Sequence, residues 1–348
     1  MAEGKKYYGF VDNMRAMGML LIAAIHAPGW GEYITSLLSG IGVPLFFFVS
    51  GMLIPMSKKL APFSDNLKEY SRKLLLPYLL FFLFSWLYWI VTFRLGNSAN
   101  VYIHYKWWYP LEGLLFGSGE LLYVNPALWF FPALWMTTLL YFIFSRYFKG
   151  LAVWLLAIVV SVAFVALRTS DFPRLPWGLD NALASVIFFS AGNYFAGQWM
   201  KWFSEIAKLP AALLATLCFV LYMLLYTVNG SIDVNSLNFG NGVVTYFTMT
   251  LFGIGAILFV SKLWEPPEPF KWISRNSIFI FPTHMVFYRI FTGVFMEVFH
   301  FPATFKEDSF LWGIVYVLLA FMLAWPASMV LKKYFHFFFS SGRPFVPS

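Results

Sequence analysis

The stretch from Leu74 to Phe93, LLLPYLLFFLFSWLYWIVTF, contains 20 residues and no charged side chain. A helix of about 20 apolar residues spans the hydrocarbon layer of a bilayer, so this stretch predicts a transmembrane helix. The whole chain has the same character: of 348 residues, 60% are hydrophobic, 22% are aromatic and 11% are charged, with a mean hydropathy of +0.70. Soluble domains carry about 25% charged residues. The sequence therefore predicts a membrane protein.

Apolar windows of similar length recur along the chain and leave no room for a soluble core. They predict an all-α, polytopic bundle of about ten transmembrane helices, formed by a single domain that covers residues 1–348. The segment WWYPLEGLLFG at 107–117 lies in the long connection between residues 96 and 125, and it predicts a short interfacial or re-entrant helix. The ten windows are 13–30, 33–56, 74–94, 126–146, 150–167, 181–199, 209–229, 241–261, 274–298 and 309–331.

The basic residues predict the orientation of the bundle. Placing both termini and the even-numbered loops on one side gathers 17 of the 24 Lys and Arg residues there, against five on the other side and two within helices. Basic loop residues are retained in the cytoplasm, so both termini are expected to be cytoplasmic. The net charge of +8 is then a topology signal, and no nucleic-acid partner is expected.

Metal chemistry and disulfide chemistry have little support in the sequence. The single cysteine, Cys218, lies within an apolar window, so neither an internal disulfide nor a zinc site built on several thiolates is possible. The chain also has no glycine-rich phosphate loop and no HExxH or GxSxG motif. We expect no metal site.

Four ionisable side chains fall inside the predicted helices, where such groups are costly and are candidates for a functional site: Arg15, His26, His284 and Arg289. Arg15 and His26 are eleven residues apart, which is about 16 Å along a helix. Eleven steps of about 100° come close to three full turns, so both side chains are predicted to share one face. Spacing alone also permits plainer roles: Arg15 pairing with Asp12 or reaching lipid phosphates, and either histidine packing within the bundle.

Several motifs occur together in a specific order: Arg15-x10-His26, GVPLFFFVSGMLI at 42–54, YSRKLLLPYLL at 70–80, PALWFFPALW at 126–135 and SIFIFPTHMVF at 277–287. In this order they resemble the membrane-bound acyltransferase family three, also called acyltransferase-3, and the resemblance covers the full chain. Phe281 stands where that family more often has Tyr.

The resemblance implies an O-acyltransferase in the bacterial cytoplasmic membrane. Such an enzyme moves an acyl group, expected here to be acetyl, from cytoplasmic acyl-CoA to a hydroxyl of a cell-surface or lipid-linked glycan. Acyl-CoA is then a co-substrate, and no permanently bound cofactor is implied. Succinyl remains an alternative acyl group, and both the acceptor glycan and the oligomeric state are left open.

The resemblance also implies roles for particular residues. An uncharged imidazole can take a proton, so His26 is expected to be the general base that activates the acceptor hydroxyl. Arg15 is expected to hold the donor or to stabilise charge at its carbonyl. The role of His284 rests on depth: it lies about as far along its predicted helix as His26 does along the first, so both helices are expected to face a common cavity in which His284 binds the donor carbonyl or the acceptor.

Arg72 and Lys73 match the basic pair of the family motif and are expected to bind the phosphates of coenzyme A. From their positions alone, Arg289 is expected to bind substrate and gate the outer end of the site, and Trp107, Trp108 and Trp129 are expected to bind substrate.

Other interpretations of these residues stay open. The positive-inside rule explains basic residues such as Arg72 and Lys73, and an interfacial aromatic belt explains Trp107 and Trp108 equally well. The competing function is a transporter or flippase that holds an anionic or lipid-linked glycan cargo. Against it, the sequence shows no repeated half with matched Gly/Pro-broken helices. A purely structural subunit fits poorly with four ionisable groups inside helices.

Overall fold

The computed structural model describes residues 7–95, 106–119, 121–169, 172–302, 304–307 and 309–334. Within these ranges the chain is helical and contains no strand; Asp233 and Asn238 form an isolated bridge. Ten helices have 17 residues or more, and each overlaps one predicted window: α1 (Gly9–Ile25), α2 (Gly31–Met52), α5 (Leu76–Leu95), α7 (Phe130–Tyr147), α8 (Leu151–Leu167), α9 (Leu179–Gln198), α11 (Lys208–Asn229), α12 (Val243–Val260), α13 (Glu268–Glu297) and α14 (Phe310–Tyr334).

The expected all-α membrane bundle is confirmed. In the described part of the chain, seven helical stretches are long and apolar enough to cross a membrane by themselves. The other three long helices are less typical: α1 and α8 have 17 residues each, and α9 buries Asp180, Asn181 and Asn193 among its apolar residues. The exact number of crossings and the side on which the termini lie stay predictions.

Short elements connect the long helices. The predicted helix in WWYPLEGLLFG is confirmed as α6, although residues 96–105 of the same connection lie outside the described residues. The short elements are α3 (Met56–Leu60), α4 (Phe63–Tyr70), a π-helical turn (Ser71–Leu75), α6 (Pro110–Phe116), α10 (Met200–Glu205) and three 3₁₀ turns (Pro126–Trp129, Pro176–Gly178 and Phe305–Glu307).

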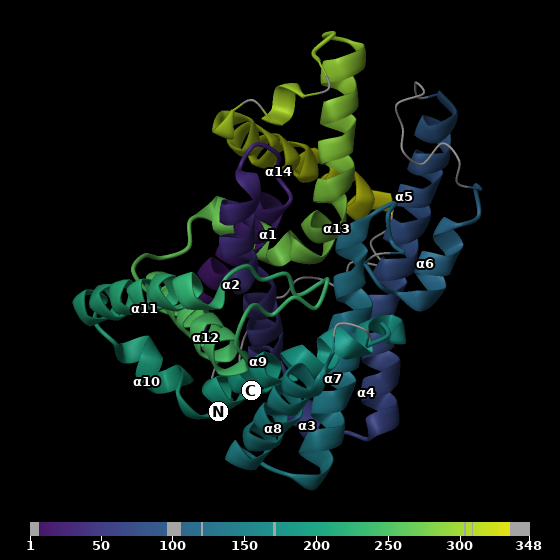
Figure 1. Cartoon of the computed structure of the whole chain (residues 1–348). Coiled ribbons are helices and arrows are strands. Elements are labelled where there is room, and N and C mark those ends of the chain that lie inside the picture. Colours follow the sequence, from purple (N-terminus) through teal and green to yellow (C-terminus); the bar gives the residue numbers. More distant parts are fainter. Residues whose placement is uncertain are drawn as a thin grey trace.

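Helix α1 lies at the centre of the bundle, between α2 and α13 (Figure 1). Helix α2 then packs on α9, which also contacts α7 and α8, while α11 and α12 form a pair beside α2. Helix α14 packs on α13 and also touches α1. Segments from the two ends of the chain, α1 and α13, are therefore direct neighbours in the interior.

The packing of α2 on α9 depends on two glycines, each of which lies against the backbone of the opposite helix. A Cβ atom placed on Gly51 would meet the carbonyl oxygen of Phe189, and one placed on Gly192 would meet that of Phe48, each at 1.9 Å. Small residues let membrane helices approach closely, because there is little hydrophobic driving force between helices in lipid. Helices α2 and α9 therefore approach each other closely at Gly51 and Gly192.

Replacing Gly192 with Ala should destabilise the bundle by about 1–3 kcal/mol, because the added methyl group forces α2 and α9 apart. The control is Gly197→Ala in the same helix, since a Cβ atom there would meet nothing within 4 Å. That control should be neutral or slightly stabilising, because Ala favours a helix over Gly. Thermal unfolding of both variants in detergent measures the difference; equal midpoints would contradict the close contact.

The predicted first window, 13–30, is wrong at both ends. Helix α1 starts at Gly9 and ends at Ile25, and His26 is its C-cap. The chain then turns through Pro28 and Gly29, and Gly29 has a φ of +82° that favours glycine. A Cβ atom there would also meet the Ser309 carbonyl oxygen at 2.5 Å. His26 therefore lies at a helix end and not within the helix.

Candidate active site

Helices α1 and α13 run side by side in the same direction, and side-chain contacts join them along their length. Near the start of both helices, the Ser274 hydroxyl donates to Asp12 Oδ1 at 2.5 Å, and Arg15 Nη2 donates to the Ser277 hydroxyl at 3.0 Å. Further along, the Tyr288 hydroxyl donates to the Ala23 carbonyl at 2.9 Å. These contacts fix the register of the two helices.

The two candidate histidines meet where α1 ends, beside the middle of α13. The ring centroids of His26 and His284 are 5.3 Å apart, with an angle of 31° between the ring planes. Arg15 and His26 both contact α13, so the predicted shared face of α1 is confirmed. The roles expected for these three residues are not tested by this geometry and stay predictions.

The surroundings of His284 define which of its ring nitrogens lacks a hydrogen-bond partner among the described residues. Its side chain is fully buried, and Nδ1 lies 2.5 Å from the carbonyl oxygen of Phe281. A carbonyl only accepts, so Nδ1 carries the proton in this contact, and Nε2 of the neutral ring carries a lone pair. Among the residues described, Nε2 has no hydrogen-bond partner. It is therefore a buried acceptor that needs a donor such as a hydroxyl.

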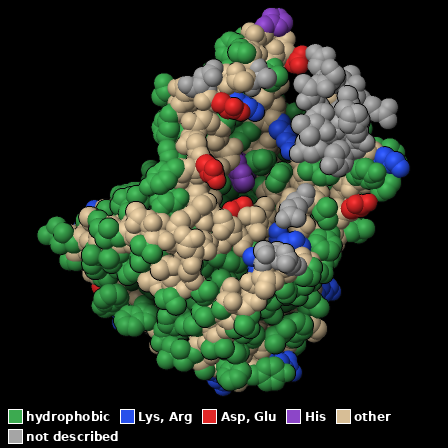
Figure 2. Space-filling model, in the orientation of Figure 1, with side chains coloured by type: hydrophobic (Ala, Val, Ile, Leu, Met, Phe, Trp, Pro, Cys, Tyr) green, Lys and Arg blue, Asp and Glu red, His purple; other side chains and the backbone are tan. Residues whose placement is uncertain are grey.

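His26 is the more accessible member of the pair, because it is half-buried while His284 is fully enclosed. Figure 2 shows a hollow on one face of the molecule in which a histidine side chain is visible, with acidic side chains at its border. Phe281 and Tyr288 lie against the His284 ring, with centroids 6.1 and 5.7 Å away. His26 is thus the ring that a small molecule can reach, and His284 is the ring that the side chains of Phe281 and Tyr288 hold in place.

Arg15 lies nearer the start of α1. Most of the N–H donors of its guanidinium make no hydrogen bond to a described residue. Only Nη2 donates to a described residue, and the Asp12 carboxylate acts on the guanidinium electrostatically. Both oxygens of that carboxylate already accept hydrogen bonds, from Tyr7 at 2.5 Å and from Ser274. Burial and the bond to Asp12 raise the pKa of the Tyr7 hydroxyl, so it stays a donor. Arg15 is thus available to an added anion.

The two basic residues expected to bind coenzyme A differ in their surroundings. Both are exposed on the π-helical turn. Lys73 Nζ is 2.5 Å from Glu69 Oε1 and lies over the Tyr70 ring, and the other oxygen of Glu69 pairs with Lys58. Arg72 has no ion-pair partner in the described ranges. Arg72 is therefore the more available of the two for a phosphate.

The three tryptophans expected to bind substrate are in different settings. Trp107 is 52% exposed and stacks on Trp86, with ring centroids 5.9 Å apart. Trp108 is 38% exposed and carries Lys106 over its ring. Trp129 is buried at 5% exposure against Phe130, so its faces are covered by the protein. Only Trp107 and Trp108 present surface to a ligand in this conformation, and the role expected for all three stays a prediction.

Arg289 donates to the backbone of a distant segment. Its Nη1 and Nη2 atoms lie 2.5 and 2.7 Å from the carbonyl oxygens of Val124 and Tyr123. The next residue, Asn125, donates to the Pro282 carbonyl at 2.8 Å. Sequence analysis did not identify Asn125, because a lone Asn before a Pro is typical of an ordinary helix start. The expected role of Arg289 in substrate binding stays a prediction.

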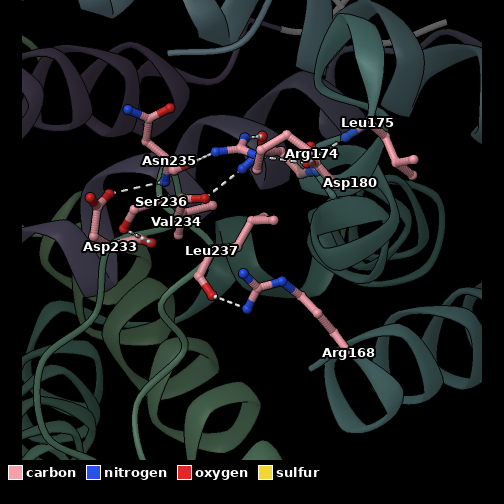
Figure 3. Close-up of polar contacts among 10 residues, drawn as sticks. Arg168, Arg174, Leu175, Asp180, Asp233, Val234, Asn235, Ser236 and Leu237 are labelled. Atoms are coloured by element: carbon pink, nitrogen blue, oxygen red, sulfur yellow. Dashed lines mark hydrogen bonds and ion pairs between the residues drawn. The ribbon is translucent and has the colours of Figure 1, made fainter. Parts of the chain in front are cut away.

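A second group that sequence analysis missed fixes the loop between α11 and α12 (Figure 3). Arg174 pairs with the fully buried Asp180 at 2.6 Å and donates to the Asn235 carbonyl at 2.9 Å. Arg168 donates to the Leu237 carbonyl at 3.0 Å in the same loop. This loop carries Asp233, whose carboxylate acts electrostatically on His26. The two arginines thus hold in place a loop whose carboxylate acts on the histidine pair.

Comparison with known families agrees with this architecture. The sequence model of a family described as an acyltransferase domain matches residues 8–329, which include both helices of the histidine pair. The chain therefore belongs to the acyltransferase-3 family, and it is a multi-pass membrane acyltransferase. The comparison with curated proteins found no match. Family membership favours the transferase over the transporter that the sequence left as an alternative.

Proposed function

We propose that this protein is an acyl-CoA-dependent O-acyltransferase of a bacterial cytoplasmic membrane, and that it acylates a hydroxyl of a cell-surface or lipid-linked glycan. The observation that carries the proposal is the pair formed by His26 and His284, with ring centroids 5.3 Å apart. Acetyl is the acyl group proposed. No permanently bound cofactor takes part in the proposed reaction.

In the proposed reaction, His26 takes the proton of the acceptor hydroxyl while the oxygen attacks the thioester carbonyl. A new C–O bond forms, the C–S bond breaks, and the thiolate of coenzyme A leaves with the proton that His26 then returns. Because Nε2 of His284 is an unused acceptor, it suits a hydroxyl better than a carbonyl oxygen. The proton of the attacking hydroxyl goes to His26, so His284 Nε2 is proposed to accept a hydrogen bond from a neighbouring hydroxyl of the acceptor. His284 thus orients the acceptor and not the donor carbonyl.

The donor is proposed to lie along α1, with its acyl end at the histidines and its anionic end toward the cytoplasm. Arg15 and His26 lie on the α13 side of α1, about 16 Å apart along the helix axis. An elongated thioester fits this separation better than a compact ligand. Guanidinium groups suit phosphates because several N–H donors point in one plane. Trp107 and Trp108 are proposed to stack on the acceptor sugar, and Arg289 to contribute near the outer end.

Transfer by the purified protein tests the proposal directly. Protein in detergent, supplied with acetyl-CoA and with glycans from cells that lack the gene, should release coenzyme A and produce glycans heavier by one acetyl group. Succinyl-CoA in parallel distinguishes the two acyl groups. Mass spectrometry of surface glycans from cells with and without the gene identifies the acceptor. Coenzyme A release and glycan masses that do not respond to the protein would reject the proposal.

Replacing Arg72 with Ala should raise the KM for acetyl-CoA about tenfold while kcat changes little, because a charged hydrogen bond to phosphate contributes about 1.5–3 kcal/mol. Lys73→Ala is the matched control, since Lys73 is already paired with Glu69. Its effect on KM should be smaller. Initial rates at varied acetyl-CoA measure both; a fall in kcat alone in Arg72→Ala would argue against phosphate binding.

A further inference from the structure

Asn125 makes contacts that its position in the sequence does not explain. It is fully buried and immediately precedes the 3₁₀ turn Pro126–Trp129, yet its side chain makes no capping hydrogen bond to that turn. Its Nδ2 atom donates instead to the Ser85 hydroxyl of α5 at 3.0 Å and to the Pro282 carbonyl of α13 at 2.8 Å. Asn125 therefore links two helices that are remote in sequence.

The contact at Pro282 reaches the part of α13 that carries His284. A proline inside a helix has no N–H to donate and weakens the helix around it. Side chains make further bonds to this part of the backbone: Thr283 Oγ1 donates to the Phe279 carbonyl at 2.8 Å, and His284 Nδ1 to that of Phe281 at 2.5 Å. Bonds made by side chains therefore supplement the helical backbone bonds where His284 is attached.

Arg289 secures the same segment on the other side of His284. Its bonds to the Val124 and Tyr123 carbonyls hold residues 123–125 against α13 one turn beyond the histidine. The preceding residue, Tyr288, points to another face of α13 and is bonded to Ala23 of α1. The part of α13 that carries His284 is thus held between α1 and the segment 123–125.

We propose that Asn125 is a positioning residue, which holds the Pro282 carbonyl so that the His284 ring stays beside His26. The proposal rests on the proposed function only for its effect on the rate of transfer. Asn125 touches neither histidine in these contacts, and it acts through the backbone of α13.

Asn125→Leu removes the amide at similar volume, and Asn193→Leu is its matched control. Asn193 is also a buried amide that joins two helices: it donates to the Gly51 and Ile54 carbonyls at 3.1 and 3.2 Å, and it accepts from Tyr141 at 2.5 Å. Displacing a reacting group by about 1 Å costs about 10²-fold in rate. Asn125→Leu should therefore lower kcat by about that factor and leave the KM for acetyl-CoA almost unchanged, while Asn193→Leu should lower stability with little effect on kcat.

A second measurement does not depend on transfer. Diethyl pyrocarbonate modifies accessible imidazoles, and mass spectrometry reports the modified residue. His284 is buried and should react slowly in the unaltered protein and in Asn193→Leu, but at least several-fold faster in Asn125→Leu. If the unaltered protein transfers no acyl group, the proposed function fails, yet this measurement still decides the role of Asn125.

The outcomes separate positioning from general stability. Equal losses of kcat in the two variants, or unchanged modification of His284 in Asn125→Leu, would overturn the proposal. If Asn125→Leu does not fold, Ser85→Ala replaces it, because it removes the second partner of the same amide and leaves Asn125 in place. It should show the same two effects in weaker form, and a Ser85→Ala protein with normal kcat and normal His284 reactivity would reject the positioning role.

Discussion

His26→Ala should fold normally and lose acyl transfer by about 10²–10⁴-fold, the contribution of a positioned general base. His284→Ala should also lose a large part of kcat, because a neighbouring hydroxyl of the acceptor would no longer find its hydrogen-bond acceptor at Nε2 and the acceptor would be poorly oriented. Residues that act as a unit show non-additive losses of rate. The double variant should therefore be only slightly less active than the less active of the two single variants. Coenzyme A release at saturating acetyl-CoA and acceptor measures all three.

His300→Asn is the matched control for the histidine pair. His300 is exposed and has a φ of +56°, a conformation that Asn adopts more readily than Ala. Its replacement should leave the rate and the thermal midpoint unchanged. Full activity in His26→Ala would remove that residue from the chemistry. Losses in the two single variants that multiply in the double variant would show that the histidines act independently.

Arg15→Ala should lower kcat/KM for acetyl-CoA by about 10²-fold, because a guanidinium that binds an anion contributes several charge-assisted hydrogen bonds. A shortened donor, acetyl-pantetheine, distinguishes the two roles considered for this residue. If Arg15 binds the phosphates near the nucleotide, the variant and the unaltered protein should use the shortened donor equally well. If it stabilises charge at the carbonyl, the loss should persist with either donor.

Ser277→Ala separates the charge of Arg15 from its anchor. It removes the only described hydrogen-bond partner of the guanidinium but leaves the charge in place. A loss of a few-fold or less is expected. If Ser277→Ala were as inactive as Arg15→Ala, the arginine would act by joining α1 to α13 and not by binding the donor.

The architecture could be predicted from sequence because each membrane helix gives a continuous apolar signal over about 20 residues. Each of the ten windows contains most of one long helix, and the glycine at position 51 indicates close packing of α2. The ends of helices were less predictable. The stop of α1 at Ile25 depends on Pro28 and Gly29, and the fit of Gly29 depends on the backbone at Ser309, which lies far away in the chain.

The site was predictable where residues on one helix define it and unpredictable where distant segments meet. The shared face of Arg15 and His26 follows from the period of a helix, and similar depths indicate His284 as the neighbour of His26. Nothing in the local sequence assigns Asn125 to Pro282, or Arg174 to Asp180 and the loop at Asn235. Those contacts arise from tertiary packing, and single polar residues give no periodic signal that would reveal them.

The contact between α1 and α13, which lie near opposite ends of the chain, has a consequence for biosynthesis. Arg15 and Ser277 are separated by 262 residues, so at about 5–20 residues per second the ribosome needs on the order of 10–50 s to supply the second helix. During that interval the guanidinium of Arg15 and the imidazole of His26 lack their final neighbours. The histidine pair can only form when synthesis is nearly finished. On the proposed function, nascent chains that stop before α13 should therefore show no acyl transfer.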